Sequence, residues 1–153
     1  MNKKILCAVA AVAVGAVCAI PASAQVKPDV LVKQRQAAMV LMGKYFYGHL
    51  RPVAQGKMPY DAATVQRNVQ YLDALSKMPW DGFAAGTKDV KSRTLPVAFS
   101  DAAKFKKGQD NFQAEVTRLS EVARKGDESA IRSQILAVNK SCSACHDDFR
   151  ERN

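Results

Sequence analysis

The stretch IRSQILAVNKSCSACHDDFR, residues 131–150, lies close to the end of the 153-residue chain. Its apolar residues and cysteines recur at alternating spacings of four and three, the repeat of a helix that packs along a core. The members of this stripe are Ile131, Ile135, Val138, Cys142, Cys145 and Phe149. Because both cysteines belong to the stripe, we expect their thiols to face the interior of a helical bundle, one turn apart.

The same stretch contains Cys142-Ser143-Ala144-Cys145-His146, a C-x-x-C-H run. This run is the attachment signature of a c-type haem, in which two thiols bond covalently to the porphyrin and the adjacent imidazole ligates the iron. It predicts one haem c, held by Cys142 and Cys145, with His146 on the iron. Since little chain follows His146, a ligand on the other face of the iron must come from upstream or be absent.

Three other interpretations of the cysteine pair are weaker. A thioredoxin-type pair is expected at the start of a helix that follows a strand, and no strand pattern precedes Cys142. A structural zinc site needs about four ligands, and outside the motif residues 25–153 offer His49 and carboxylates but no second cysteine pair. A disulfide between cysteines three apart on a helix has poor bridging geometry.

Residues 1–24 have the pattern of a secretory signal peptide. A basic start at residues 2–4 is followed by an apolar stretch over 5–20 and by Ala22-Ser-Ala24, which fits the cleavage rule for small residues. The apolar stretch is too short and wrongly flanked for a membrane span. We therefore expect a periplasmic protein that begins at Gln25.

Cleavage after Ala24 would also remove Cys7 and Cys18, so the motif cysteines would be the only thiols left. A lipid anchor at Cys18 is disfavoured because the bulky Val17 precedes it. Losing two lysines would lower the formal charge from +9 to +7. The remaining 25–153 has the length of one domain. Its basic residues are dispersed, which argues against a nucleic-acid partner.

The chain lacks convincing period-2 alternation, and four of its stretches have helical periodicity. The first helix is expected over 28–52 and would end at Pro52, and the second over 60–78 with Asp61 as its N-cap. The third would run from Ser100, as N-cap, to Gly126. The fourth would run from Asp127, as N-cap, to the C-terminus. The connection over 79–99 is longer than ordinary helix–helix loops of about 2–8 residues. The prediction is an all-α, antiparallel four-helix bundle whose covalently attached haem lies between helices.

With these elements the chain resembles the cytochrome c prime family, the four-helix class of c-type cytochromes with a C-terminal attachment motif. The resemblance covers residues 25–153. It rests on Arg35-Gln-Ala-Ala-Met39, Pro59-Tyr-Asp-Ala-Ala63, Met78-Pro-Trp80, Phe83, Gly86-Thr87, Phe99-Ser-Asp-Ala102 and Cys142 to Arg150. Phe99 is one departure, because the family often has Trp there.

The resemblance implies a role for several residues around the haem. His146 would be the proximal ligand, with Arg150 one helical turn on, where a guanidinium disfavours a protonated imidazole. Arg35 would pair with a haem propionate, and Trp80 would pack near the haem edge. Otherwise Arg150 and Arg35 would be solvated surface charges, and Trp80 an ordinary core residue.

Met39 would line the distal side of the iron, four residues after Arg35 on the same helix face. In a five-coordinate haem it would guard a vacant site that a small diatomic gas can still enter. A thioether is also a competent iron ligand, and low-spin relatives use a first-helix methionine in that way. Ordinary core packing is the third interpretation, and the sequence does not separate the three.

Two functions follow, from different classes. The first is a five-coordinate, high-spin haem protein that binds NO and CO, in NO handling or electron transfer. The second is a low-spin electron carrier with His146 and Met39 as axial ligands and an acidic redox partner protein. An enzyme is disfavoured because the distal face has no acid–base pair. The resemblance also implies a homodimer through the first two helices, with Val40 and Tyr47 as candidate contacts.

Overall fold

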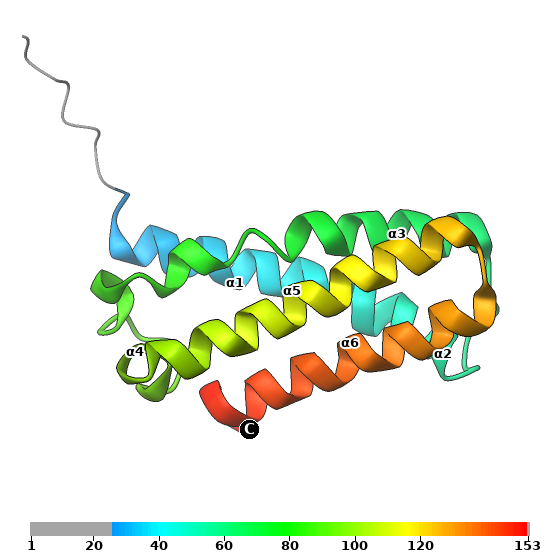
Figure 1. The fold of residues 1–153 in the computed structure, drawn as a ribbon. Helices are drawn as coiled ribbons and strands as arrows, with labels where there is room; N and C mark the ends of the chain where they lie inside the picture. The colour runs from blue at the N-terminus through cyan, green and yellow to red at the C-terminus, as the bar shows by residue number, and fades with distance from the viewer. Residues whose placement is uncertain (1–25, 153) are drawn as a thin grey trace, which may run out of the picture.

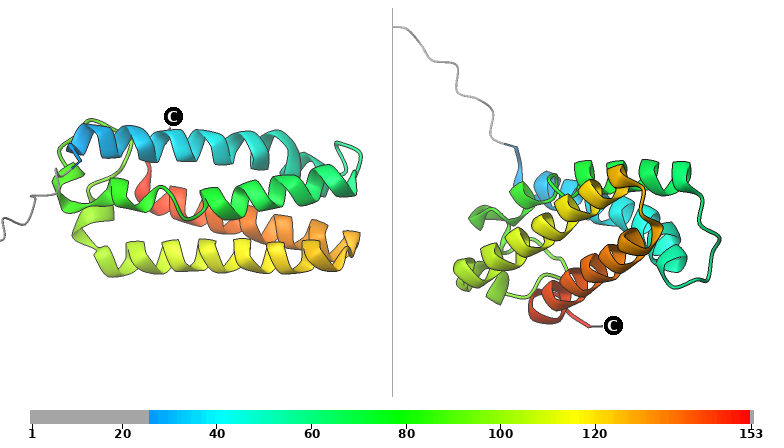
Figure 2. Two further views of the ribbon diagram at one scale, coloured as in Figure 1. Left: turned by 90° about the horizontal axis from the view of Figure 1, so that it is seen from above. Right: turned by 45° about the vertical axis from the view of Figure 1, so that its right-hand side comes forward.

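The computed structural model describes residues 26–152, and these form a bundle of four long helices (Figure 1). The first comprises α1 (Pro28–Tyr45), the π-helix η1 (Phe46–Leu50) and α2 (Arg51–Ala54), and the others are α3 (Ala62–Leu75), α5 (Ala102–Lys125) and α6 (Glu128–Phe149). Successive long helices run in opposite directions, and the two further views in Figure 2 agree. The predicted all-α antiparallel bundle is confirmed. The predicted signal peptide lies outside the described residues.

The first helix continues through Pro52 to Ala54, so the prediction that Pro52 ends it is wrong. An α-helical ladder would place the proline ring against a carbonyl of the preceding turn. Here the preceding turn is widened into the π-helix η1, and Arg51 N–H donates to the Phe46 carbonyl, five residues back. The wider turn lets the chain pass the proline without ending the helix.

The helix ends follow local capping chemistry. The side chains of Asp61 and Asp127 accept hydrogen bonds from the N–H groups of Thr64 and Ala130, as predicted for N-caps. Gly126 adopts φ 79° at the end of α5, a left-handed conformation that glycine takes without strain. The N-cap of α5 was predicted wrongly.

Asp101, not Ser100, caps α5, because its carboxylate accepts from Lys104 N–H at 3.0 Å. Ser100 instead ends the short helix α4 (Val97–Ser100). The second long helix is also shorter than expected, since it ends at Leu75 rather than near Met78.

The core is a continuous apolar cluster between the helices. The predicted stripe of α6 is buried, with Ile131 1%, Ile135 0% and Val138 0% exposed. Each such side chain stabilises the fold by roughly 1.5–3 kcal/mol relative to an exposed one. α5 packs along α6, and α3 packs against both α1 and α5.

The connection over 79–99 folds onto one end of the bundle and contains the 3₁₀ helices η2 (Trp80–Phe83) and η3 (Ala85–Thr87) and the helix α4. Its residues 92–95, called the 92–95 segment below, pair with the end of α6. Thr94 and Arg150 form an antiparallel bridge, and Leu95 N–H donates to the Phe149 carbonyl at 2.9 Å. The predicted long loop therefore packs on the bundle.

Within the described residues, α1 and α6 do not pack closely against each other, although α2 packs against α6. The space between them, at the end where the connection folds back, holds a cavity. Within residues 26–152, no helix is both long enough and apolar enough to cross a membrane.

Candidate haem-binding site

A cavity of about 610 Å³ lies between α1 and α6, and η2 and the 92–95 segment contribute to its wall. Cavities of about 300–1,000 Å³ with mostly apolar walls and a few convergent polar groups are typical of sites for small molecules and cofactors. This cavity has that composition. The sequence-predicted residues Arg35, Met39, Trp80, Cys142, Cys145, His146 and Arg150 all line it.

The last turns of α6 bring Cys142, Cys145 and His146 to this cavity, each half-buried. Both cysteines are free thiols, so the structure does not have a disulfide between them. Burial, followed by the neighbouring Cys145, raises the pKa of the Cys142 thiol to about 12. Burial and then the Arg150 charge lower the pKa of His146, which favours the neutral imidazole that ligates metals.

A thioredoxin-type pair and a zinc site also fail on geometry. The cysteines lie near the end of α6, whereas a thioredoxin-type pair lies at the start of a helix. Within residues 26–152, no three His, Cys, Asp or Glu side chains gather as a zinc site requires. Two thiols one turn apart and an adjacent neutral imidazole, facing one apolar cavity, fit a c-type haem.

Arg35 is buried in the cavity wall, with 3% of its surface exposed, so it is not a solvated helix arginine. Its guanidinium donates to the Gly82 carbonyl at 2.6 Å and lies over the Phe83 ring, 4.3 Å from the centroid. Only a glycine fits at position 82, because a Cβ there would come within 2.8 Å of the Leu31 carbonyl oxygen. Arg35 thus ties η2 to α1.

Met39 lies one turn after Arg35 on α1, lines the cavity and packs against the core. Met42 also lines the cavity and is only 8% exposed, consistent with a core residue. His49, Met58 and Met78 are outside the cavity lining. Besides His146, the described methionines and histidines that the fold brings to the cavity are therefore Met39 and Met42.

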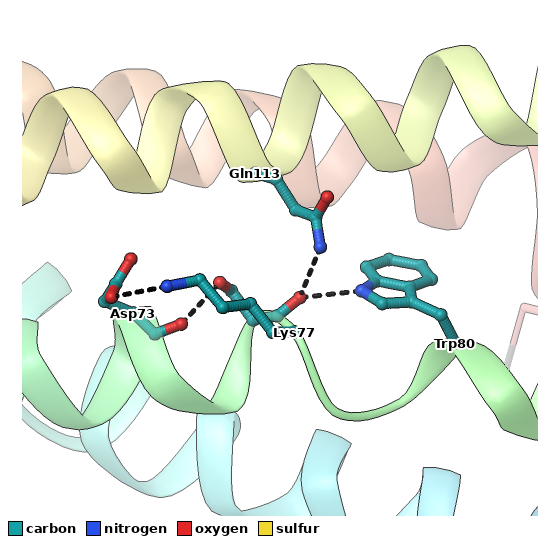
Figure 3. Close-up of polar contacts among 5 residues, drawn as sticks. Asp73, Lys77, Trp80 and Gln113 are labelled. Carbon is teal, nitrogen blue, oxygen red and sulfur yellow. Dashed lines mark hydrogen bonds and ion pairs between the residues drawn. The ribbon is translucent and has the colours of Figure 1, made fainter.

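Trp80 is fixed by the end of α3 (Figure 3). Its indole N–H donates to the Ser76 carbonyl at 2.7 Å, and the Gln113 side-chain amide donates to the same oxygen at 3.2 Å. The turn that contains Ser76 is stabilised by Lys77, which pairs with the Asp73 carboxylate at 2.8 Å. A carbonyl at a helix end needs such donors, and here they place the indole on the cavity wall.

Known proteins resemble this chain over nearly all of the described residues. The family model described as Cytochrome C' matches residues 30–150. The chain belongs to the cytochrome c' family. The cytochrome c' of Alcaligenes xylosoxydans xylosoxydans is 43% identical over 126 residues, which are 82% of this chain and 97% of the relative. That of Rubrivivax gelatinosus is 35% identical over 127 residues, 82% of this chain and 98% of the relative.

Solved structures of cytochrome c prime from Alcaligenes xylosoxidans agree with the fold. The nitric oxide complex of a leucine-to-alanine mutant has a TM-score of 0.77 at 41% identity, covering 84% of this chain and 99% of that one. The carbon monoxide complex of a leucine-to-glycine variant has a TM-score of 0.76 at 42% identity, covering 82% and 98%. Membership of the cytochrome c' family implies a covalently bound c-type haem.

Aromatic rings form much of the cavity wall in this cytochrome c' fold. Trp80 stacks on Phe83 with centroids 6.1 Å apart, and Phe105 packs against Phe83 at 4.6 Å and Phe149 at 5.2 Å. Phe112 completes the set at 6.3 Å from Trp80. Phe149 was predicted as a residue of the apolar stripe, but periodicity alone does not tell a core position from a cavity wall.

Positive charge dominates the polar part of the lining. Arg35, Arg93 and Arg150 line the cavity, and none of its described lining residues is Asp or Glu. Three of the lining residues carry hydroxyl groups: Tyr47, Ser92 and Thr94. Sequence reasoning missed Ser92, Arg93 and Thr94, because only their pairing with the end of α6 brings this part of the connection to the cavity.

Val40 and Tyr47 lie on the rim of the cavity, 70% and 40% exposed. Burial of its other face is the main reason that the pKa of the Tyr47 phenol is raised, and Arg51 lies 5.6 Å from its ring centroid. The two residues proposed for a dimer contact are therefore also next to the cavity opening.

Proposed function

We propose that this cytochrome c' is a periplasmic haem protein that binds small diatomic gases, NO and CO. One haem c would be attached through Cys142 and Cys145, with His146 as the proximal ligand of a five-coordinate, high-spin iron. The observation that carries the proposal is the single apolar cavity that brings this motif together with Met39. When bound, the haem supplies the iron that takes the gas.

The residues of the chain would bind and orient the haem. The charge of Arg150 favours a neutral His146, and Arg35 lines the cavity with a guanidinium suited to a propionate carboxylate. The indole of Trp80, fixed by Ser76, would pack against the haem edge. Arg35 would also act as a positioning residue, because its bond to Gly82 holds η2 in place.

Met39 would line the distal side and keep water and larger ligands from the iron. Its side chain is a thioether with three rotatable bonds, which can move aside for a diatomic gas. Relatives at about 41% identity have been solved with nitric oxide or carbon monoxide bound, which supports a gas-binding role here.

The test is an absorption spectrum of the ferric and ferrous holoprotein, with and without CO. A high-spin spectrum that shifts on adding CO supports the proposal. Met39→Ala should raise CO affinity at least tenfold, whereas Met42→Ala, in the core part of the lining, should change it little. His146→Ala should abolish the proximal imidazole signature in resonance Raman spectra. The proposal fails if wild type is low-spin and indifferent to CO.

That failing outcome would favour the second candidate, a low-spin electron carrier. It rests on the presence of the Met39 thioether and the His146 imidazole in the lining of one cavity. Methionine ligation generally raises the reduction potential, and the basic charge would attract an acidic redox partner. A Met–iron charge-transfer band that Met39→Ala removes would establish it. Neither candidate is an enzyme.

We also propose a homodimer through the outer face of the first helix. Val40 and Leu41 are 70% and 42% exposed there, and Tyr71 on α3 is 43% exposed. Exposed apolar groups of this kind are typical of protein contacts. Sedimentation equilibrium should show a dimer that Val40→Glu dissociates, and a monomeric wild type would refute the contact.

A further inference from the structure

Three guanidinium groups and no carboxylate line the described cavity. A haem brings two propionates, so on the proposed function at least one guanidinium still lacks a negative partner. Of the three, Arg35 is buried, and its guanidinium donates a hydrogen bond to the Gly82 carbonyl. Arg93 and Arg150, at the other side of the cavity, are exposed enough to meet a ligand from solvent.

The backbone pairing of the 92–95 segment with the end of α6 brings Arg93 and Arg150 to the same cavity. Thr94 bridges Arg150, and on the next position Glu151 N–H donates to the Arg93 carbonyl at 2.9 Å. The Arg93 guanidinium donates back to the Glu151 carbonyl. One of its donors is thereby used, and the remaining N–H groups of this planar fork stay free for an oxyanion.

The neighbouring carboxylates are committed to other cations. Asp147 pairs with Arg152 at 3.3 Å, and Asp148 pairs with Lys104 at 3.0 Å. Within residues 26–152, no ion pair joins a carboxylate to Arg93 or Arg150. Both arginines line the same cavity as His146.

We propose that Arg93 and Arg150, with the Thr94 hydroxyl, bind a small planar oxyanion of the nitrite and nitrate class beside the His146 face of the cavity. A guanidinium fork matches the two oxygens of such a group, and a second guanidinium and a hydroxyl can reach the rest. A haem propionate has the same carboxylate-like chemistry, so it is the other source that the test separates.

The probe is nitrate, a weak ligand for haem iron, titrated into the ferric holoprotein by calorimetry at constant ionic strength. Wild type should show one saturable site. Arg93→Gln and Arg150→Gln should each weaken nitrate binding at least tenfold, and Arg93→Lys, which keeps the charge but not the fork, should be intermediate. Lys91→Gln removes an exposed charge from the same connection outside the lining, and should weaken binding less than twofold.

Because Arg93→Gln also removes a contact to Glu151, Thr94→Val supplies a variant without a charge change, and it should weaken nitrate binding about threefold. Lack of saturable binding, or equal losses in the arginine variants and Lys91→Gln, would overturn the proposal. A shift of the propionate bending band in resonance Raman spectra of Arg93→Gln, with nitrate affinity unchanged, would assign the pair to the propionate instead. Failure of the gas-binding proposal would appear separately, in the CO spectrum.

Discussion

Replacing Gly82 by alanine should destabilise the protein by about 3 kcal/mol. The new Cβ would fall inside the contact radius of Arg35 Cβ and within 2.8 Å of the Leu31 carbonyl oxygen. Neither is the free end of a flexible side chain, so η2 must move away from α1. Overpacking of this kind costs about 1–3 kcal/mol. Movement also breaks the buried bond from Arg35 to the Gly82 carbonyl, and a hydrogen bond from a charged group contributes about 1.5–3 kcal/mol.

Urea unfolding of the holoprotein, followed by circular dichroism, measures this loss. With a slope of about 2 kcal/mol per M, the midpoint of Gly82→Ala should fall by roughly 1.5 M. Gly48→Ala is the matched control, because a Cβ there meets no atom within 4 Å. It should leave the midpoint unchanged or raise it slightly. Equal midpoints for the two variants would refute the close approach of η2 to α1.

Three further predictions concern stability. Ile135→Ala, at a fully buried position of α6, should cost about 2–5 kcal/mol in the same urea assay, whereas the adjacent Leu136→Ala, 45% exposed, should cost under about 1 kcal/mol. Asp127→Ala should lower the free energy of unfolding by about 1 kcal/mol through the lost cap of α6, and Asp127→Ser should restore most of it; a Ser variant no better than Ala would contradict the capping role. Hydrogen bonds from the Thr64 side chain and then its N–H hold the pKa of Asp61 below its ordinary 3.8, so the stability that this carboxylate adds is present above that pH and lost as the pH falls through the lower folded value. Thermal melts between pH 6 and pH 2 should show a smaller acid loss for Asp61→Asn, and identical pH profiles would count against the cap.

The long helices and most of their caps could be predicted because they depend on residues near in sequence. Asp61, Asp127 and Gly126 act within one turn of their own helix. Asp101 could have been found in the same way, since a carboxylate is as good an N-cap as the hydroxyl of Ser100. The prediction that Pro52 ends the first helix was wrong because the π-turn that accommodates this proline has no clear sequence signal.

The residues of the candidate site also differ in whether nearby or distant parts of the sequence place them. His146 and its cysteines follow from one local motif, which the helix alone brings to the interior. Arg93 could not be placed, because its position depends on pairing between the connection and a segment 58 residues away. The burial of Arg35 likewise depends on the approach of Gly82, 47 residues on. Contacts of this length are decided by tertiary packing and not by periodicity.

The cavity separates the first helix from the last, so the cofactor would serve as the packing partner that joins the two ends of the chain. Its attachment would let the apolar faces of α1 and α6 bury themselves against a shared surface, which would stabilise the folded state. A chain that fails to acquire haem would therefore open more often along this seam. Proteases would cleave it there first, so the cellular level of the protein should follow haem supply.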